Sequence, residues 1–81
     1  MPQLKVLSGP DLVRIFSLFG FTVTAQKGSH IKLLRVAPGG LRQILIVPNH
    51  SELDRGTLRA IYRQALRYIS EEKLREHFYT S

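Results

Sequence analysis

Three short β-type segments in the middle of the chain restrict its fold more than any other feature. Residues 21–26, FTVTAQ, alternate apolar and polar side chains, a pattern typical of a half-buried strand. Residues 30–36 and 42–47 predict two further strands, and the APGG segment between them indicates a turn. Pro48 ends the third strand, because proline has no N–H to donate to a strand ladder. The economical arrangement of these strands is a three-stranded antiparallel meander.

A helix is predicted on the N-terminal side of the strands, over residues 7–20. Ser8 is the expected N-cap, Pro10 suits the first turn, and Asp11 stands where a capping box requires an acid. Gly20 follows the last apolar residue of the helical pattern and is expected to end the helix.

Two helical segments are predicted after the strands. Residues 53–69 carry an apolar stripe, with Asp54 as the expected N-cap. Residues 70–78 have a new N-cap at Ser70 and predict either a short third helix or a bent continuation of the second. The predicted class is therefore an α+β fold of order α-β-β-β-α(α), with helices on one face of a three-stranded antiparallel sheet. A length of 81 residues without linkers predicts a single domain over residues 1–81.

The hairpin between the first two strands admits two registers. A two-residue Gly28–Ser29 turn pairs Lys27 with His30 and places Lys32 among the apolar residues of the sheet. A three-residue loop pairs Thr24 with His30 instead, and it directs His30 and Lys32 to the face away from the core. Because register follows the buried face, we expect the three-residue loop and an accessible His30.

The charge of the chain narrows the classes of partner. Twelve Lys and Arg residues against six Asp and Glu residues give a formal net charge of +6. A compact basic domain attracts polyanions through its field, which leaves nucleic acid, an acidic protein and an anionic membrane surface open. The predicted second helix carries an arginine at every fourth position: Arg55, Arg59, Arg63 and Arg67. This arginine ridge is either a solvated face or a docking surface for phosphates or an acidic partner, since arginine binds both groups bidentately.

Other features bear on location and cofactors. The chain has no apolar run near the ~18 residues that a membrane helix requires, and its first residues lack the apolar region of a signal peptide. We therefore expect a cytoplasmic protein without a membrane segment. His30, His50 and His77 show no metal-ligand spacing, so we expect no metal and no other cofactor, and we expect His77 at the surface.

Histidine is the side chain best suited to acid/base chemistry here. Its unperturbed pKa of about 6.5 allows proton exchange near neutral pH. His30 and His50, together with nearby lysines, could form an acid/base pair for RNA cleavage, although a histidine also begins strands without any catalytic role. The chain contains no phosphate-cradling P-loop, no dinucleotide-binding fingerprint and no nucleophile elbow.

Two separated segments resemble a known family. KGSH, residues 27–30, and VPNHSELDRGTLRAIYRQA, residues 47–65, closely resemble the HicA (YcfA-like) toxins of type II toxin–antitoxin systems. The resemblance covers about residues 7–66. It implies a double-stranded-RNA-binding-domain-like fold, an mRNA endoribonuclease acting in stress responses, and a HicB antitoxin as protein partner. Because the histidines show no metal-ligand spacing, we expect the cleavage to be metal-independent.

The resemblance also implies functional residues. The family's catalytic histidine lies in its Gly-Ser-His motif, which corresponds to His30 here. The residues expected to bind RNA or support catalysis are Lys27, Gly28, Ser29, Lys32, His50, Arg59 and Arg63. Two departures stand out: IKLLRV follows His30 where the family often has another His and a Phe, and the tail over residues 68–81 is longer and more basic. The alternative hypotheses are a non-catalytic RNA-binding module and a basic protein adaptor.

Overall fold

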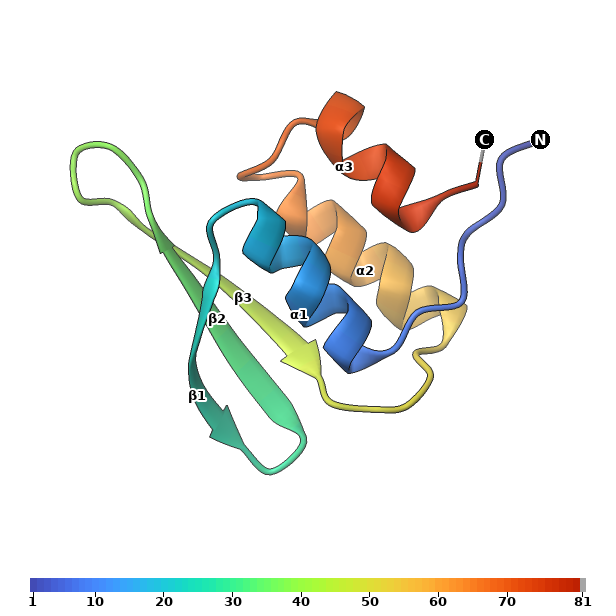
Figure 1. Cartoon of the computed structure of the whole chain (residues 1–81), viewed down its shortest axis with the longest axis horizontal. Helices are drawn as coiled ribbons and strands as arrows, with labels where there is room; N and C mark the ends of the chain where they lie inside the picture. Colours follow the sequence, from blue (N-terminus) through green and yellow to red (C-terminus); the bar gives the residue numbers. More distant parts are fainter. Residues whose placement is uncertain (81) are drawn as a thin grey trace.

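Three strands and three helices follow the order that the sequence predicts. A computed structural model describes residues 1–80, and Figure 1 labels its elements. They are α1 Gly9–Leu18, β1 Thr22–Lys27, β2 His30–Val36, β3 Arg42–Pro48, α2 Arg55–Ala65 and α3 Glu71–Phe78. The predicted order α-β-β-β-α(α) is confirmed, and α3 is a separate helix rather than a continuation of α2. None of the helices in residues 1–80 has the length and apolar character required to cross a bilayer.

The start of α1 is determined by hydrogen bonds within four residues. The Ser8 hydroxyl accepts from the Asp11 backbone N–H at 3.0 Å, and the Asp11 carboxylate accepts from the Ser8 backbone N–H at 2.9 Å. These two bonds form the predicted capping box. The same hydrogen bonds lower the pKa of the Asp11 carboxyl, the bond from the Ser8 backbone contributing most. Gly20 follows the helix with a φ of +91°, a value that few other residues adopt.

The caps of the other two helices differ in strength. The Asp54 carboxylate accepts hydrogen bonds from the Thr57 hydroxyl at 2.6 Å and the Thr57 backbone N–H at 3.0 Å. Both bonds lower the pKa of the Asp54 carboxyl, the hydroxyl bond more than the backbone bond. Ser70 occupies the N-cap of α3 but makes no side-chain cap hydrogen bond. In this helix, Glu71 and Glu72 in the first turn complement the helix dipole instead.

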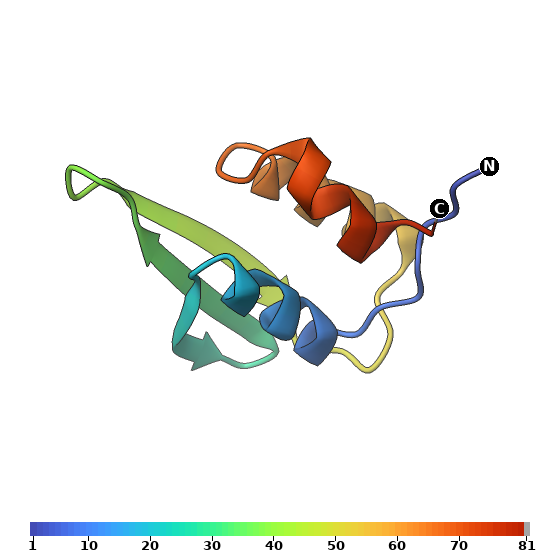
Figure 2. The ribbon, with the colours of Figure 1, turned by 45° about the horizontal axis from the view of Figure 1, so that its top comes forward.

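The sheet has a helix-covered inner face and an uncovered outer face. The strand order is β1-β2-β3, and both pairings are antiparallel. Figure 2 shows the helices on one side of this sheet. The inner face consists of the buried strand residues Ile31, Leu33, Leu45 and Val47. The outer face consists of the residues that alternate with them on β2 and β3, together with their partners on β1.

The register of the first hairpin differs from the expected one. Lys27 pairs with His30 across a two-residue Gly28–Ser29 turn, so the expected three-residue loop is wrong. Gly28 has a φ of +59° and Ser29 does not have a positive φ, which is the pattern of a type II′ turn. The expected orientation of His30 is nevertheless correct, because Ile31 is buried and its neighbours in β2 face outward.

A β-bulge resolves the conflict that led to the wrong register. The pairing shifts between Val23 and Ala25, which leaves one extra residue in β1. On the turn side of the bulge Ala25 lies opposite Lys32, and on the other side Val23 lies opposite Leu33. The extra residue changes which face each side chain occupies, so the two-residue turn does not force Lys32 into the core.

The first strand is more exposed than its alternating pattern predicts. Every residue of β1 is exposed, and Phe21, immediately before the strand, is buried. The expectation of a half-buried strand is therefore wrong. The physical reason is position: β1 extends away from the helices, whereas β3, the other edge strand, packs against α2 and has buried residues (Figure 1).

The C-terminal helix belongs to the core. Phe78 is fully buried, with its ring centroid 6.1 Å from that of Phe16 on α1 and 5.1 Å from that of Tyr62 on α2. The two terminal segments lie side by side, because Lys5 donates its backbone N–H to Phe78 O at 2.8 Å and Leu4 forms a β-bridge with Tyr79. Residues at both ends of the chain thus close the core over α1 and α2.

One charged side chain crosses from the sheet to the helices. Arg35 of β2 donates to the carbonyl oxygens of Phe19 and Tyr68, each at 2.8 Å. Its Nε donates to Gln43 Oε1 at 2.6 Å, and its guanidinium lies 4.8 Å from the ring centroid of Phe21. Arg35 therefore joins the sheet to the end of α1 and to the connection between α2 and α3.

Candidate functional site

Two sequence segments meet at one end of the sheet. His30 begins β2 and pairs with Pro48, the last residue of β3. The backbone N–H of Asn49 then donates to the carbonyl oxygen of Ser29 at 2.5 Å. The Gly28–His30 turn and the loop that carries His50 therefore lie next to each other, although about twenty residues separate them in sequence.

The first helix closes this end of the sheet. Gly9 donates its backbone N–H to the carbonyl oxygen of His50 at 2.8 Å. A Cβ atom on Gly9 would overlap the Pro48 carbonyl oxygen and would lie 2.8 Å from the Cα of Asn49. Glycine is therefore required here by the close approach of two backbones. Our sequence interpretation did not single out Gly9, because a glycine before a proline at a helix start carries no signal of a distant contact.

His30 lies on the outer face between two lysines. It is exposed, and so are Lys27, its partner on β1, and Lys32, two residues further along the same face of β2. Neither lysine forms an ion pair with any group in residues 1–80. Both ammonium groups are thus available to an external anion. Gln26 Nε2 donates to the Gly28 carbonyl oxygen at 3.2 Å and ties the turn to β1.

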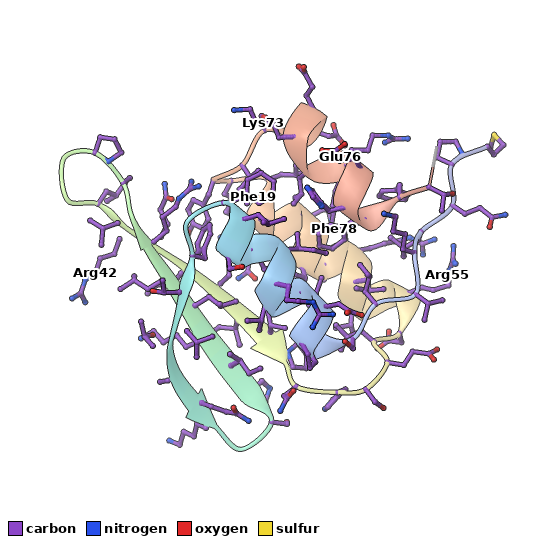
Figure 3. All side chains as sticks on the ribbon, viewed as in Figure 1. Phe19, Arg42, Arg55, Lys73, Glu76 and Phe78 are labelled. Atoms are coloured by element: carbon purple, nitrogen blue, oxygen red, sulfur yellow. The ribbon has the colours of Figure 1, made fainter. Side chains whose placement is uncertain are left out.

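The arginine ridge lies apart from this group. Arg59 and Arg63 are exposed on α2, whose buried residues face the inner side of the sheet. The structure therefore brings Lys27, Gly28, Ser29, His30, Lys32 and the loop of His50 together, but it does not bring Arg59 or Arg63 to them. Figure 1 shows the separation of the two regions: the turn between β1 and β2 lies at the bottom of the view, whereas α2 lies above it and to the right. The side chains of both regions are drawn in Figure 3, where Arg55 marks the start of α2.

The remaining histidine belongs to the helical side of the molecule. His77 of α3 is partly buried, with 27% of its side chain exposed, and it packs edge-on against Phe19 with ring centroids 5.5 Å apart. Its expected surface position is therefore only partly correct. Within residues 1–80, no three or more His, Cys, Asp or Glu side chains are grouped as metal ligands would be.

Comparison with known families identifies the chain. A family model described as the HicA toxin of bacterial toxin–antitoxin systems matches residues 9–66. The chain belongs to the HicA family. A search of curated proteins found no match. The matched part of this HicA toxin runs from α1 to the end of α2, so it includes both segments that meet at the end of the sheet. As a member of this family, the chain is a toxin of a toxin–antitoxin system and has a cognate antitoxin as its partner.

Proposed function

We propose that this HicA toxin, acting as one domain over residues 1–81, is a metal-independent endoribonuclease that cleaves mRNA. The observation that carries the proposal is the position of His30. It is an exposed histidine at the end of a strand, between two unpaired lysines and beside the loop of His50. This arrangement combines a proton-transfer group with positive charge at a surface that an RNA strand can reach.

The proposed reaction uses a nucleophile from the substrate. The ribose 2′-OH attacks the adjacent phosphorus, the new O2′–P bond forms and the P–O5′ bond breaks. The proton leaves O2′ and a proton is delivered to O5′, so the products are a 2′,3′-cyclic phosphate and a 5′-hydroxyl. His30 moves a proton in this exchange as general acid/base, a contribution that is typically worth about 10²–10⁴-fold in rate.

The lysines on either side of His30 have the second role. Negative charge accumulates on the phosphorane oxygens in the transition state, and fixed cations near them lower its free energy. Lys27 and Lys32 are exposed and unpaired within residues 1–80, so they can bind the phosphate without first breaking an ion pair. Gly28 and Ser29 hold His30 at the start of β2 through their tight turn.

We further propose that the cognate antitoxin is of the HicB type and blocks access to His30. The arginine ridge supports a second contact surface. Its four arginines are exposed and form no ion pair within residues 1–80. Arg59 and Arg63 then bind either RNA phosphates or acidic side chains of the antitoxin, since guanidinium groups bind both.

The test is an RNA-cleavage assay in the presence of EDTA. Wild type, His30→Ala and His77→Gln are incubated with labelled single-stranded RNA after circular dichroism has verified their folding. His77→Gln is the matched control, because this histidine lies on α3 away from the site. We expect cleavage by wild type and the control, none by His30→Ala, and 2′,3′-cyclic phosphate ends on the products.

Three results would contradict the proposal. Equal cleavage by His30→Ala and wild type would remove His30 from the catalytic role. Products that end in a 3′-hydroxyl would exclude attack by the 2′-OH. Salt-sensitive RNA binding without cleavage by any variant would instead identify a non-catalytic RNA-binding module.

A further inference from the structure

The outer face of the sheet is basic and contains no acid. The sequence has no aspartate or glutamate between Asp11 and Glu52, a stretch that includes all three strands and both of their turns. Lys27 and Lys32 provide positive charge at the His30 end of this face. Arg42 provides it at the other end, where it is exposed and pairs with the outward-facing Val36.

The middle of the same face is aliphatic and partly open to solvent. Val36 is 59% exposed and Ile46 is 38% exposed, while Leu34 and Ile44 are partly buried. The pairing of Lys32 with Ile46 and of Leu34 with Ile44 places these side chains in adjacent rows on one surface. In the described residues the helices lie on the other side of the sheet, so they do not cover this surface (Figure 2).

Cations around exposed aliphatic groups match a particular form of nucleic acid. Phosphates bind to Lys and Arg, whereas base faces favour apolar side chains. In a duplex the base faces are stacked inside and unavailable, but in a single strand they are exposed. A single strand can therefore contact both the cations and the aliphatic side chains of the outer face, whereas a duplex can contact only the cations.

We propose that the outer face binds a single-stranded segment of RNA that extends from the His30 end toward Arg42. The inference rests on the proposed function, because it takes RNA as the substrate of His30. It adds Arg42 and Ile46 to the binding residues and assigns the substrate a path across β2 and β3. Strand β2 has seven residues and is about 20 Å long, enough for only a few nucleotides.

The composition of the face determines the kind of binding. Its three strands contain no Phe, Tyr or Trp, so bases do not stack along it as they do on most single-strand binders. Phosphate contacts then carry most of the affinity. We expect binding that depends strongly on salt and weakly on base identity.

The experiment separates the charged contact from the apolar one. His30→Ala serves as a background that binds without cleaving, and the probe is a short fluorescein-labelled single-stranded RNA. Arg42→Gln and Ile46→Thr are added to this background. Lys73→Gln is the matched control, because Lys73 is exposed on α3 and is not part of the sheet. Each variant is first checked for an unchanged thermal unfolding midpoint.

We expect the two face variants to weaken binding in different ways. Arg42→Gln should lower affinity and reduce the slope of log K against log salt concentration by about 0.7, the value for one lost phosphate contact on a single strand. Ile46→Thr should lower affinity with the slope unchanged, because it removes an apolar contact and no charge. Lys73→Gln should leave both quantities close to those of the background.

Four results would overturn the inference. Equal weakening by Arg42→Gln and Lys73→Gln would show that overall charge rather than this face attracts RNA. Unchanged RNA affinity in both face variants would place the RNA elsewhere, and weakened self-association or antitoxin binding alone would make the face a protein interface. A duplex that binds the background as tightly as the single strand would also contradict it.

The proposed nuclease activity is tested separately, by measuring RNA cleavage by the protein that retains His30. If wild type cleaves RNA and the face variants bind RNA normally, the inference about the outer face is contradicted and the proposed nuclease activity is supported. If the face variants lose RNA binding as expected but wild type does not cleave RNA, RNA binding by the outer face is supported and the proposed nuclease activity is contradicted. Absence of both binding and cleavage would remove both proposals.

Discussion

Gly9 of α1 lies so close to Pro48 of β3 that a Cβ atom would overlap the Pro48 carbonyl oxygen. The contact joins the start of the first helix to the loop that leads to His50. Both partners at this point are backbone atoms, which cannot rotate away as a side chain can. The position of the His50 loop, and through Asn49 the position of the His30 turn, therefore depend on a glycine at residue 9.

We predict that Gly9→Ala destabilises the fold by about 1–3 kcal/mol, the usual cost of forcing extra atoms into a packed site. The molecules that remain folded should also cleave RNA more slowly than wild type, because the loop of His50 must move to make room for the Cβ atom. Urea unfolding and the cleavage assay measure the two effects.

Gly56→Ala is the matched control for this prediction. A Cβ at Gly56 meets only the Asp54 carboxylate oxygen at 3.3 Å, and alanine favours a helix by up to about 1 kcal/mol over glycine. Its stability should be unchanged or higher. Equal stability of the Gly9→Ala and Gly56→Ala proteins would show that the contact with Pro48 is not tight.

Arg35 should contribute more to stability than Arg42, the other arginine of the sheet. Replacing it with methionine removes the donors to Phe19 O and Tyr68 O, which are part-buried acceptors. We predict a loss of about 1.5–3 kcal/mol, the range for hydrogen bonds that involve a charged group. Chemical denaturation measures it, with Arg42→Met, an exposed position on β3, expected to change stability by less than about 0.5 kcal/mol. Similar losses in both proteins would refute the bridging role of Arg35.

Tyr62 should make stability sensitive to alkaline pH. Burial, followed by the hydrogen bond to Glu71, raises the pKa of Tyr62 to about 12. Because the folded pKa is above the unfolded value of about 10, this stabilisation is complete below pH 10 and is lost as pH rises toward 12, by about 1.4 kcal/mol per unit. Urea unfolding from about pH 8 to about pH 12 measures the slope. Tyr62→Phe should lack this component, and an equal decline in both proteins would disprove it.

The segment after residue 66 should be needed for folding, although the family match ends there. Phe78 is fully buried between α1 and α2, so Phe78→Ala should cost about 3–5 kcal/mol. Leu18→Ala removes an apolar side chain that is 71% exposed and should cost little. Thermal unfolding compares the two. A small loss for Phe78→Ala would mean that α3 is an appendage rather than part of the core.

Elements defined by nearby residues were predictable. The cap of α1 forms between Ser8 and Asp11 and the cap of α2 between Asp54 and Thr57, so each signal and its partner lie within four residues. The strand order and the outward orientation of His30 followed from short apolar patterns in the same way. The family resemblance is confirmed over residues 9–66.

Features that depend on distant contacts were not predictable from the pattern. The alternation in β1 predicted burial, but the helices pack on β2 and β3 and leave every residue of β1 exposed. The bulge between Val23 and Ala25 changes which side of the sheet the following side chains of β1 occupy, and no residue in FTVTAQ indicates that a bulge forms there. The contact of Gly9 with Pro48 and the hydrogen bond from Arg35 to Tyr68 join residues more than thirty positions apart.

The sequence by itself determined the order of the elements, the caps of α1 and α2, the excess of positive charge and the two family motifs. Each of these depends on residue identity or on hydrogen bonds and packing within one turn or one strand. Only the tertiary structure decided that the turn of His30 lies beside the loop of His50, that Arg59 and Arg63 lie apart from them, and that the basic outer face is uncovered. The physical reason is that these relations arise from packing between elements that are distant in sequence, and this packing cannot be inferred from a residue's nearest neighbours in the chain.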